Sequence, residues 1–333
     1  SGACWRWLRF RDCPFCYLPR LSPGTAARAP MSLHPQLDDL LELRHQARAL
    51  GVAAHHLVNS SFTGLYASVF RGTGLDFDEV REYREGDDIR NMDWMVTART
   101  NSPHLKVFRE ERQRSVILCM DTGPHMSFGT RGTFKSIQAA RTAALIGWAA
   151  SKQHDRVGGV LFGNPATGQR YYRATPGRRG LWRLLRALTE PIEQGDTDES
   201  QLIAALTHLD KASDTGSLIF VIAPINQVTV GLERTLGSLR QRNDVMLLPI
   251  DDPADRELPS MGTVIFSNAA GELLEVDTDN EAGRAAFRED WEQRREELTQ
   301  LSYRLGLGLI PISTDQDVHS TMTQGLRHYV GRR

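Results

Sequence analysis

The first candidate for a chemical site is Asp121, which directly follows the short apolar run Ser115–Met120. Such a run is typical of a buried strand in a parallel sheet, and open α/β sheets bind ligands at the carboxyl ends of these strands. A carboxylate at this place is a candidate ligand for a hard cation such as Mg²⁺, which prefers several oxygen ligands in octahedral geometry. The nearby Gly123 offers no side-chain ligand, and the imidazole of His125 is a softer ligand than Mg²⁺ favours.

A second candidate is the run Gly129–Ser136 (GTRGTFKS), which nearly matches a phosphate-binding loop. Phe134 stands where that loop needs a glycine, because only a glycine lets the backbone approach the phosphates. The preceding strand is also expected to end about eight residues earlier, whereas a phosphate loop leaves its strand directly. We therefore predict no nucleotide site here, and expect a helix N-terminus with a solvated Lys135.

The densest group of charged residues lies upstream, between Phe77 and Glu111. Arginines and carboxylates alternate there around aromatic and apolar residues, and guanidinium–carboxylate pairs this close in sequence can hold an irregular segment in place. Asp87, Asp88 and Asp93 could act as acid/base groups, but no His, Ser or Cys nucleophile accompanies them. Because the arginines alternate with as many acids, a nucleic-acid surface is not favoured either. We interpret this group as structural first.

A structural role predicts burial for one residue of this group and an ion pair for another. We expect Trp94 to be largely buried, because a large aromatic side chain contributes most when it is removed from water. We expect the carboxylate of Asp93 to pair with a basic side chain, the candidates being Arg84, Arg90 and Arg99.

The elements that must position these residues follow from the spacing of apolar side chains. Short all-apolar runs alternate with amphipathic stretches, a pattern typical of a parallel sheet covered by helices on both faces. We therefore predict an α/β fold with a doubly wound, mostly parallel sheet. The predicted strands are Ser115–Met120, Val157–Phe162, Ser217–Ala223, Val245–Ile250 and Leu307–Ile312, and the predicted helices are Phe134–Gln153, Leu181–Leu188, Ser200–Leu209, Leu232–Arg240 and Glu281–Arg304.

Four parts of the chain are expected. Residues 1–30 form a disordered or non-native leader, 31–56 an N-terminal helix, and 57–114 a small β-rich region that contains the charged group. Residues 115–333 form the α/β domain, with a small hairpin inserted near 263–277.

Length and composition exclude several classes of protein. The chain has 333 residues, with 40 basic and 41 acidic side chains, so its formal net charge of −1 argues against a strongly basic nucleic-acid-binding protein. Its longest apolar runs have about eight residues, whereas a membrane-spanning helix needs about 17 to 25. Cys119 is the one cysteine after residue 30, which fits a reducing compartment and a cytoplasmic location.

The surroundings of Asp121 resemble a von Willebrand factor A-type domain. The expected strand ending in Asp121 is followed by a Met-Ser-Phe-Gly loop at Met126–Gly129, by a long helix, and by Asp155–Gly158 entering the next strand. The resemblance implies the doubly wound fold already predicted from the apolar pattern. It also implies a place for a metal ion, because such domains carry an adhesion-type site built from an Asp-x-Ser-x-Ser loop, a distant Thr and a second Asp.

At that metal-ion-dependent adhesion site (MIDAS), this chain keeps some positions and loses others. The resemblance places Asp121 and Thr197 at two ligand positions. Gly123 and His125 replace the two serines, and Pro224 stands where the second Asp belongs. A lone carboxylate and a hydroxyl are too few ligands for Mg²⁺. We therefore expect a degenerate MIDAS, with no metal and no other cofactor.

The charged group closely resembles the signature of the bacterial and archaeal family called domain of unknown function 58. That signature is Arg-Glu-Tyr-x-x-Gly-Asp-Asp-x-Arg-x-x-Asp-Trp, followed by Ala-Arg. Each of these positions is filled here, and the resemblance extends from about Ser61 to Ser313. The signature residues singled out are Arg81, Tyr83, Gly86, Asp87, Asp88, Arg90, Asp93, Trp94 and Arg99.

The family resemblance implies a gene beside a MoxR-type AAA+ ATPase and a role as adaptor or assembly factor. The first hypothesis is therefore a non-enzymatic protein-interaction module whose partners are such an ATPase and other A-domain proteins. The second is a metal-dependent ligand-binding module that uses Asp121, Thr197 and His125. A third, an enzyme that uses the neighbourhood of Asp93, lacks a nucleophile–base pair.

The first 30 residues differ in composition from the rest of the chain. They hold three of the four cysteines and five arginines against one acid, and show no helical or alternating pattern. Cys13-Pro14-Phe15-Cys16 could be a zinc or redox motif, but no second ligand pair follows at usual spacing and no strand is expected before it. We favour a segment outside the fold, ahead of a start at Met31.

Removal of residues 1–30 should leave the melting temperature unchanged, because a segment without periodicity has no face to bury. Differential scanning fluorimetry of the full and shortened chains measures this. A drop of several degrees would show that the segment packs against the fold.

Overall fold

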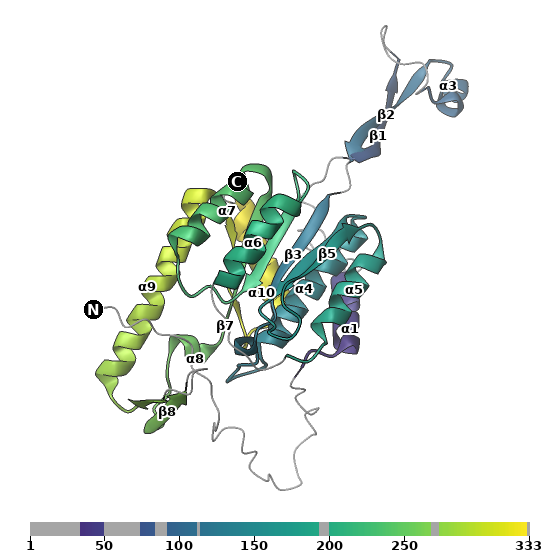
Figure 1. The fold of residues 1–333 in the computed structure, drawn as a ribbon. Coiled ribbons are helices and arrows are strands. Elements are labelled where there is room, and N and C mark those ends of the chain that lie inside the picture. Colours follow the sequence, from purple (N-terminus) through teal and green to yellow (C-terminus); the bar gives the residue numbers. More distant parts are fainter. Residues whose placement is uncertain are drawn as a thin grey trace. The chain divides into compact units, whose positions relative to one another are not determined.

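The computed structural model describes residues 34–49, 74–83, 92–111, 114–192, 200–267 and 273–331, and the chain divides into two compact units (Figure 1). Unit 1 comprises Ser1–Val69 and Ser115–Arg333, and unit 2 comprises Phe70–Arg114. The predicted leader, residues 1–30, lies outside the described residues.

Unit 1 is built on a seven-stranded sheet with the order β10-β7-β6-β3-β4-β5, in which β11 also pairs with β7. All pairings are parallel except that of β4 with β5, so the predicted doubly wound, mostly parallel sheet is confirmed. The strands are β3 (Ser115–Asp121), β4 (Arg156–Phe162), β5 (Arg170–Thr175), β6 (Leu218–Ala223), β7 (Asp244–Asp251), β10 (Gly308–Leu309) and β11 (Ile312–Ser313). After β3 the chain adds β4 and β5 on one side of the sheet. From β6 onward it adds β6, β7 and β10 on the other side of β3. The β3/β6 boundary is therefore the topological switch point, where such sheets bind ligands.

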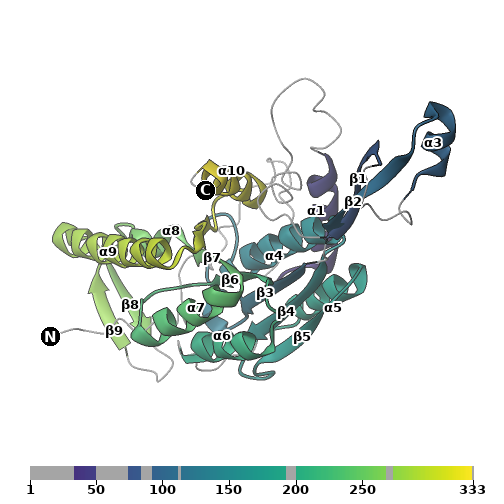
Figure 2. The same cartoon turned by 90° about the horizontal axis from the view of Figure 1, so that it is seen from above.

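Helices cover both faces of this sheet (Figure 2). One face carries α1 (Leu37–Ala49), α4 (Lys135–Lys152), α5 (Arg178–Leu188) and α10 (Val318–Gly331), and the other carries α6 (Ser200–Ala212), α7 (Val230–Arg242) and α9 (Glu281–Leu305). Every residue of β3 and β6 is buried, as their all-apolar sequences require between two helical layers. Helix α1 is tied to α4 by a hydrogen bond of 2.9 Å from Nε1 of Trp148 to the carbonyl oxygen of Leu40.

Three features of unit 1 differ from the sequence-based expectation. The last predicted strand, Leu307–Ile312, is split into β10 and β11, because Pro311 between them has no N–H to donate to a ladder. Strand β5 and helix α10 were not predicted. The sequence of β5 (RYYRAT) lacks an apolar run because it is an antiparallel edge strand with part of its side chains exposed.

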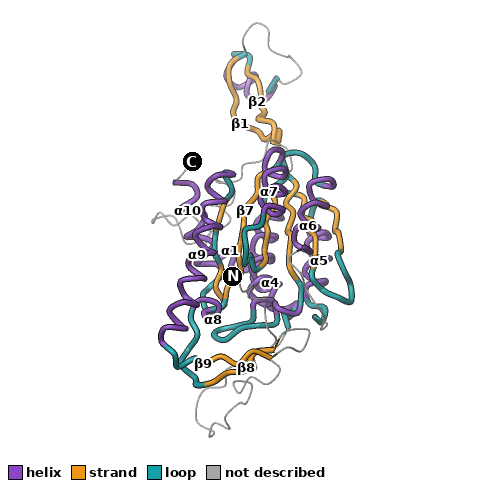
Figure 3. The backbone as a smooth tube through the Cα atoms, turned by 60° about the vertical axis from the view of Figure 1, so that its left-hand side comes forward, coloured by secondary structure: helices purple, strands orange, loops and turns teal. Residues whose placement is uncertain are grey.

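A separate two-stranded antiparallel sheet lies at one end of unit 1 (Figure 3). It consists of β8 (Thr263–Ser267) and β9 (Leu273–Asp277), and it follows the short helix α8 (Pro253–Arg256). No helix in the described part of the chain is long and apolar enough to cross a membrane.

Unit 2 contains the antiparallel pair β1 (Gly74–Glu82) and β2 (His104–Glu111), with helix α3 (Trp94–Thr100) in the connection between them. Helix α3 begins after Asp93, whose carboxylate accepts hydrogen bonds from the backbone N–H groups of Met95 (3.1 Å) and Val96 (3.2 Å). It ends at Asn101 in the left-handed conformation, which asparagine tolerates better than most residues.

His319, in helix α10, should make the stability of the fold depend on pH. Burial lowers the pKa of His319, and the nearby Asp317 only partly offsets this effect. As the pH falls through the usual histidine value of about 6.5, the unfolded chain takes up a proton before the folded one does, so stability falls.

His319→Gln should therefore reduce the loss of melting temperature between about pH 8 and pH 5.5. His328→Gln, an exposed position on the same helix, is the matched control and should retain the wild-type dependence. Equal pH dependence of the His319 variant and the wild type would contradict this assignment.

Candidate functional site

The carboxylate of Asp121 lies at the switch point and is bound by its own loop. Its Oδ1 accepts a hydrogen bond of 2.8 Å from the backbone N–H of Gly123, and its Oδ2 lies 2.9 Å from Nε2 of His125. Only 8 % of the Asp121 side chain is exposed, against 25 % for His125. The pair is therefore a nearly buried carboxylate with a partly exposed imidazole at the rim.

Local sequence explains this arrangement. A short 3₁₀ turn, Pro124–Met126, with proline in its first position, brings His125 back towards Asp121. The loop is fixed to the end of β4 because both the backbone N–H (2.7 Å) and the hydroxyl (2.8 Å) of Thr122 donate to the carbonyl oxygen of Phe162. Gly163 has φ of 90°, and a Cβ there would lie 2.5 Å from Oδ1 of Asp121. A glycine is therefore required beside this carboxylate.

The residues present do not fit an adhesion-type metal ion. Both carboxylate oxygens of Asp121 already accept hydrogen bonds, Gly123 contributes a backbone N–H, and Pro224, which directly follows β6, has no ligand atom in its side chain. Thr197 lies outside the described residues. Among the residues that are described, no group of three or more His, Cys, Asp or Glu side chains could hold a metal ion.

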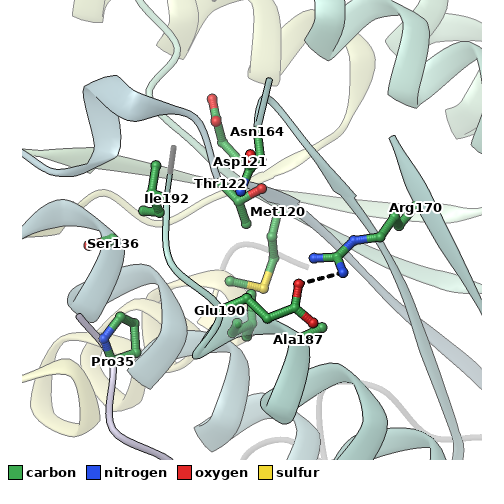
Figure 4. A pocket seen from close by; sticks show the side chains of 11 residues that line it. Pro35, Met120, Asp121, Thr122, Ser136, Asn164, Arg170, Ala187, Glu190 and Ile192 are labelled. Carbon is green, nitrogen blue, oxygen red and sulfur yellow. Dashed lines mark hydrogen bonds and ion pairs between the residues drawn. The ribbon is translucent and has the colours of Figure 1, made fainter. Parts of the chain in front are cut away.

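A cavity beside Asp121 is too small for an organic ligand (Figure 4). Its volume is about 20 Å³, which is room for about one water molecule. The ion pair between Arg170 and Glu190, at 2.6 Å, lies at its wall. A partner at this end of the sheet would therefore contact the rim, where His125 is partly exposed, rather than fill a pocket.

The one free cysteine in the described part of the chain cannot serve as a nucleophile. Cys119 lies in the middle of β3 and is fully buried. Burial, with a smaller contribution from the charge of Asp121, raises the pKa of its thiol far above the physiological range. The thiolate, which is the reactive form, is thus disfavoured.

The run that resembles a phosphate loop takes part in a network of ion pairs and hydrogen bonds that the sequence did not predict. Lys135 is only 1 % exposed, and its Nζ lies 2.6 Å from Oδ2 of Asp255. The prediction of a solvated Lys135 is wrong, because its partner comes from helix α8, far away in the sequence. The lysine that would bind phosphates in a nucleotide site is therefore occupied by a buried carboxylate.

Asp252, at the end of β7, is the centre of the same network. Its carboxylate accepts a hydrogen bond from the backbone N–H of Thr130 (2.8 Å) and others from the hydroxyls of Thr130 and Thr314, the latter at 2.5 Å. Its backbone N–H donates to Asp255 at 2.7 Å, which completes a capping box on α8. The partners Thr130 and Thr314 lie far from Asp252 in the sequence, so the sequence alone did not predict this network.

The next carboxylate, Asp251, joins α9 to the ends of β6 and β7. It forms an ion pair with Arg295 of α9, which also donates a hydrogen bond of 3.0 Å to the carbonyl oxygen of Ile225. Burial raises the pKa of Asp251, and the charge of Arg295 counteracts this effect. This ion pair fixes the loop after β6, which borders the switch point.

The signature residues lie in unit 2 as far as they are described. Arg81 is in β1 and Tyr83 directly follows it, Asp93 and Trp94 begin α3, and Arg99 is exposed in its last turn. Gly86, Asp87, Asp88 and Arg90, together with the candidate partner Arg84, lie outside the described residues.

The prediction that Trp94 is buried is wrong. Its side chain is 67 % exposed and that of its neighbour Met95 is 85 % exposed. Helix α3 has seven residues, none of them buried. The described residues of unit 2 form a single hairpin and α3, and they provide no second layer that covers the tryptophan. The carboxylate of Asp93 caps the N-terminus of α3.

Comparison with known proteins identifies the family. Residues 79–297, more than half of the chain, match the family model described as "Protein of unknown function DUF58". The chain therefore belongs to the DUF58 family, and its larger unit has the doubly wound sheet expected from the resemblance to von Willebrand factor A-type domains.

Three individual proteins show what the chain is similar to. The uncharacterized protein Rv1480 of Mycobacterium tuberculosis is 27 % identical over 303 residues, which cover 88 % of this chain and 93 % of the relative. BatB from Bacteroides thetaiotaomicron, a conserved hypothetical protein of solved structure, is 14 % identical with a TM-score of 0.38, covering 66 % of this chain and 99 % of that one. A von Willebrand factor type A structure from Catenulispora acidiphila is 10 % identical with a TM-score of 0.37, covering 66 % and 43 %. At such scores the structural matches add no detail to the site.

Lys135→Ala should lower the free energy of unfolding by about 3 to 5 kcal/mol, because it leaves the carboxylate of Asp255 buried without its charge partner. Chemical denaturation followed by circular dichroism measures the change. Lys211→Ala, at an exposed lysine of α6, is the control and should cost less than about 0.5 kcal/mol.

A double variant, Lys135→Met with Asp255→Leu, separates the charge effect from packing. It should recover most of the lost stability, because apolar replacements of a buried ion pair are often neutral. A cost below about 1 kcal/mol for Lys135→Ala would contradict a buried, paired lysine.

Proposed function

We propose that this chain is a non-enzymatic protein-interaction module that binds an acidic group of its partner at the rim formed by Asp121 and His125, without a metal ion. The observation that carries the proposal is the closed geometry of Asp121, whose two oxygens are engaged by Gly123 and His125. A carboxylate bound in this way needs no cation to be satisfied.

The chemistry of the imidazole supports an acidic group on the partner. In the A-type domains that this chain resembles, the metal often receives a carboxylate from the partner. A protonated imidazole carries a positive charge and two N–H donors, so it can bind Asp121 through one nitrogen and present charge at the rim. His125 is the more exposed member of the pair and lies where the partner would meet it.

We further propose that the partner is a MoxR-type AAA+ ATPase, as the family resemblance implies. The structure of the phosphate-loop-like run supports a division of labour between two proteins. Since Lys135 is held by Asp255 and Phe134 occupies the N-cap position of α4, this run offers no nucleotide site. Any ATP-driven step then comes from the partner.

Mixing the purified chain with the MoxR-type ATPase encoded nearest its gene should give a complex that persists in a metal chelator. His125→Ala should weaken the complex by tenfold or more, because it removes the partner's charge contact and leaves Asp121 nearly buried without its imidazole. His328→Ala, at an exposed histidine of α10, is the control and should bind as the wild type does. Biolayer interferometry with ATP, with ADP and without nucleotide measures all three proteins.

Two outcomes would overturn the proposal. The first is the lack of a complex in every nucleotide state at micromolar concentrations of both proteins. The second is a complex that the chelator dissolves and Mg²⁺ restores, with the Mg²⁺ effect lost in Asp121→Ala. That result would establish a metal-dependent module instead.

A further inference from the structure

Helix α5 and strand β5 carry an unbalanced positive charge. Residues 170–188 contain six arginines and no acidic residue. On α5 the leucines Leu181, Leu184, Leu185 and Leu188 are buried. The opposite face therefore presents Arg179, Trp182, Arg183 and Arg186, at the spacing i, i+3, i+4 and i+7 of a single helix face. We call these four residues the arginine stripe.

The arginine stripe is not neutralised by the rest of the described chain. None of its three guanidiniums forms an ion pair with a described acidic side chain, and Arg183 donates instead to the hydroxyl of Thr175, at 3.3 Å. Trp182 is 42 % exposed between these charges. An exposed tryptophan among unpaired arginines has the composition of a protein-binding surface, since Trp and Arg dominate interface energetics and Lys is depleted there.

The β8–β9 sheet carries the complementary surface. Residues 257–281 contain six acidic residues and no basic residue. In this sheet Ile265 lies opposite Glu275 and Thr263 lies opposite Asp277, so these four side chains share one face. All four are exposed, Ile265 to 60 %. We call this face the acidic hairpin face.

The two surfaces match in both charge and apolar content. On each, one exposed apolar side chain, Trp182 or Ile265, lies among charges of a single sign. Glu275 and Asp277 form no ion pair with a described basic side chain; Asp277 accepts a hydrogen bond of 3.0 Å from the backbone N–H of Asp279. Both surfaces are thus available to an external partner, and each has the chemistry that the other needs.

The positions of the two surfaces require a second molecule. In the views of Figures 1 and 2, α5 and the β8–β9 sheet lie at opposite ends of unit 1. A single copy therefore cannot bring its arginine stripe onto its own acidic hairpin face. We propose that the arginine stripe of one copy docks on the acidic hairpin face of a second copy, so that the chain self-associates head to tail.

Two physical consequences follow from such a contact. It joins two different surfaces, so each copy can bind one neighbour at each end, and the assembly is a ring or an open chain. It also depends on exposed charges, whose attraction is screened within about 3 Å at 1 M salt, compared with about 10 Å at 0.1 M. The association must therefore weaken steeply with salt. The contact involves no residue of the Asp121–His125 rim and goes beyond the proposed function.

Sedimentation velocity of the full chain over a range of concentrations tests the proposal. At low ionic strength the sedimentation coefficient should rise with concentration, and salt of about 1 M should abolish the rise. Two charge-reversed variants, Arg179→Glu with Arg183→Glu and Glu275→Arg with Asp277→Arg, should each remain monomeric. Trp182→Ala should weaken association by tenfold or more, which tests the apolar contact separately.

An equimolar mixture of the two charge-reversed variants provides the decisive comparison. Each variant alone has two surfaces of like charge, but in the mixture every stripe again meets a hairpin face of opposite sign, so association should return. Lys211→Glu with Arg234→Glu, at exposed positions of α6 and α7, is the matched control and should associate as the wild type does. Circular dichroism melting curves verify that every variant is folded.

Three results would overturn the proposal. One is a wild-type chain that stays monomeric at low ionic strength and high micromolar concentration. Another is a mixture of the two charge-reversed variants that does not associate. The third is a monomeric wild type that binds a short DNA duplex or anionic phospholipid vesicles through the arginine stripe, which would assign this surface to a polyanion instead.

Discussion

The buried ion pair between Lys135 and Asp255 is the interaction on which the strand-end surface of unit 1 depends. It connects the first residue of α4 with α8, and the neighbouring Asp252 adds the loop at Thr130 and the segment at Thr314. Charges this deep are tolerated only when each has its partner, because desolvation of an unpaired ion costs several kcal/mol. The same residues that could have formed a phosphate site are thereby used to close this end of the sheet.

The carboxylate of Asp121 is also bound within the fold, but by groups of its own loop. A carboxylate at the switch point of a doubly wound sheet must be satisfied by a cation, by hydrogen bonds or by water. Here the donors come from the loop itself, two and four residues further along the chain. Gly163 makes room for this carboxylate, and Thr122 holds the loop against β4. The cavity beside this carboxylate has room for about one water molecule, so this end of the sheet does not enclose an organic substrate.

Basic and acidic side chains are concentrated in different segments of the chain, although its formal net charge is only −1. Six arginines without an acid lie in one segment, six acids without a base lie in another, and the α/β domain separates them. Within a folded domain, opposite charges usually occur close together, so that each screens the other. Their separation on a rigid body creates two complementary surfaces, and such fields influence association more than folding.

The sequence by itself determined the sheet, because strands buried between two helical layers must be apolar along their whole length, as β3 and β6 are. It also determined the family signature and the loss of ligand atoms at Gly123 and Pro224, which depend only on residue types. Tertiary structure alone decided the burial of Lys135, since Asp255 approaches it from a distant part of the chain. It also decided the exposure of Trp94, since no described element of unit 2 covers this side chain. Residue type and local spacing are properties of the chain, whereas burial and charge pairing depend on which distant segments the fold brings together.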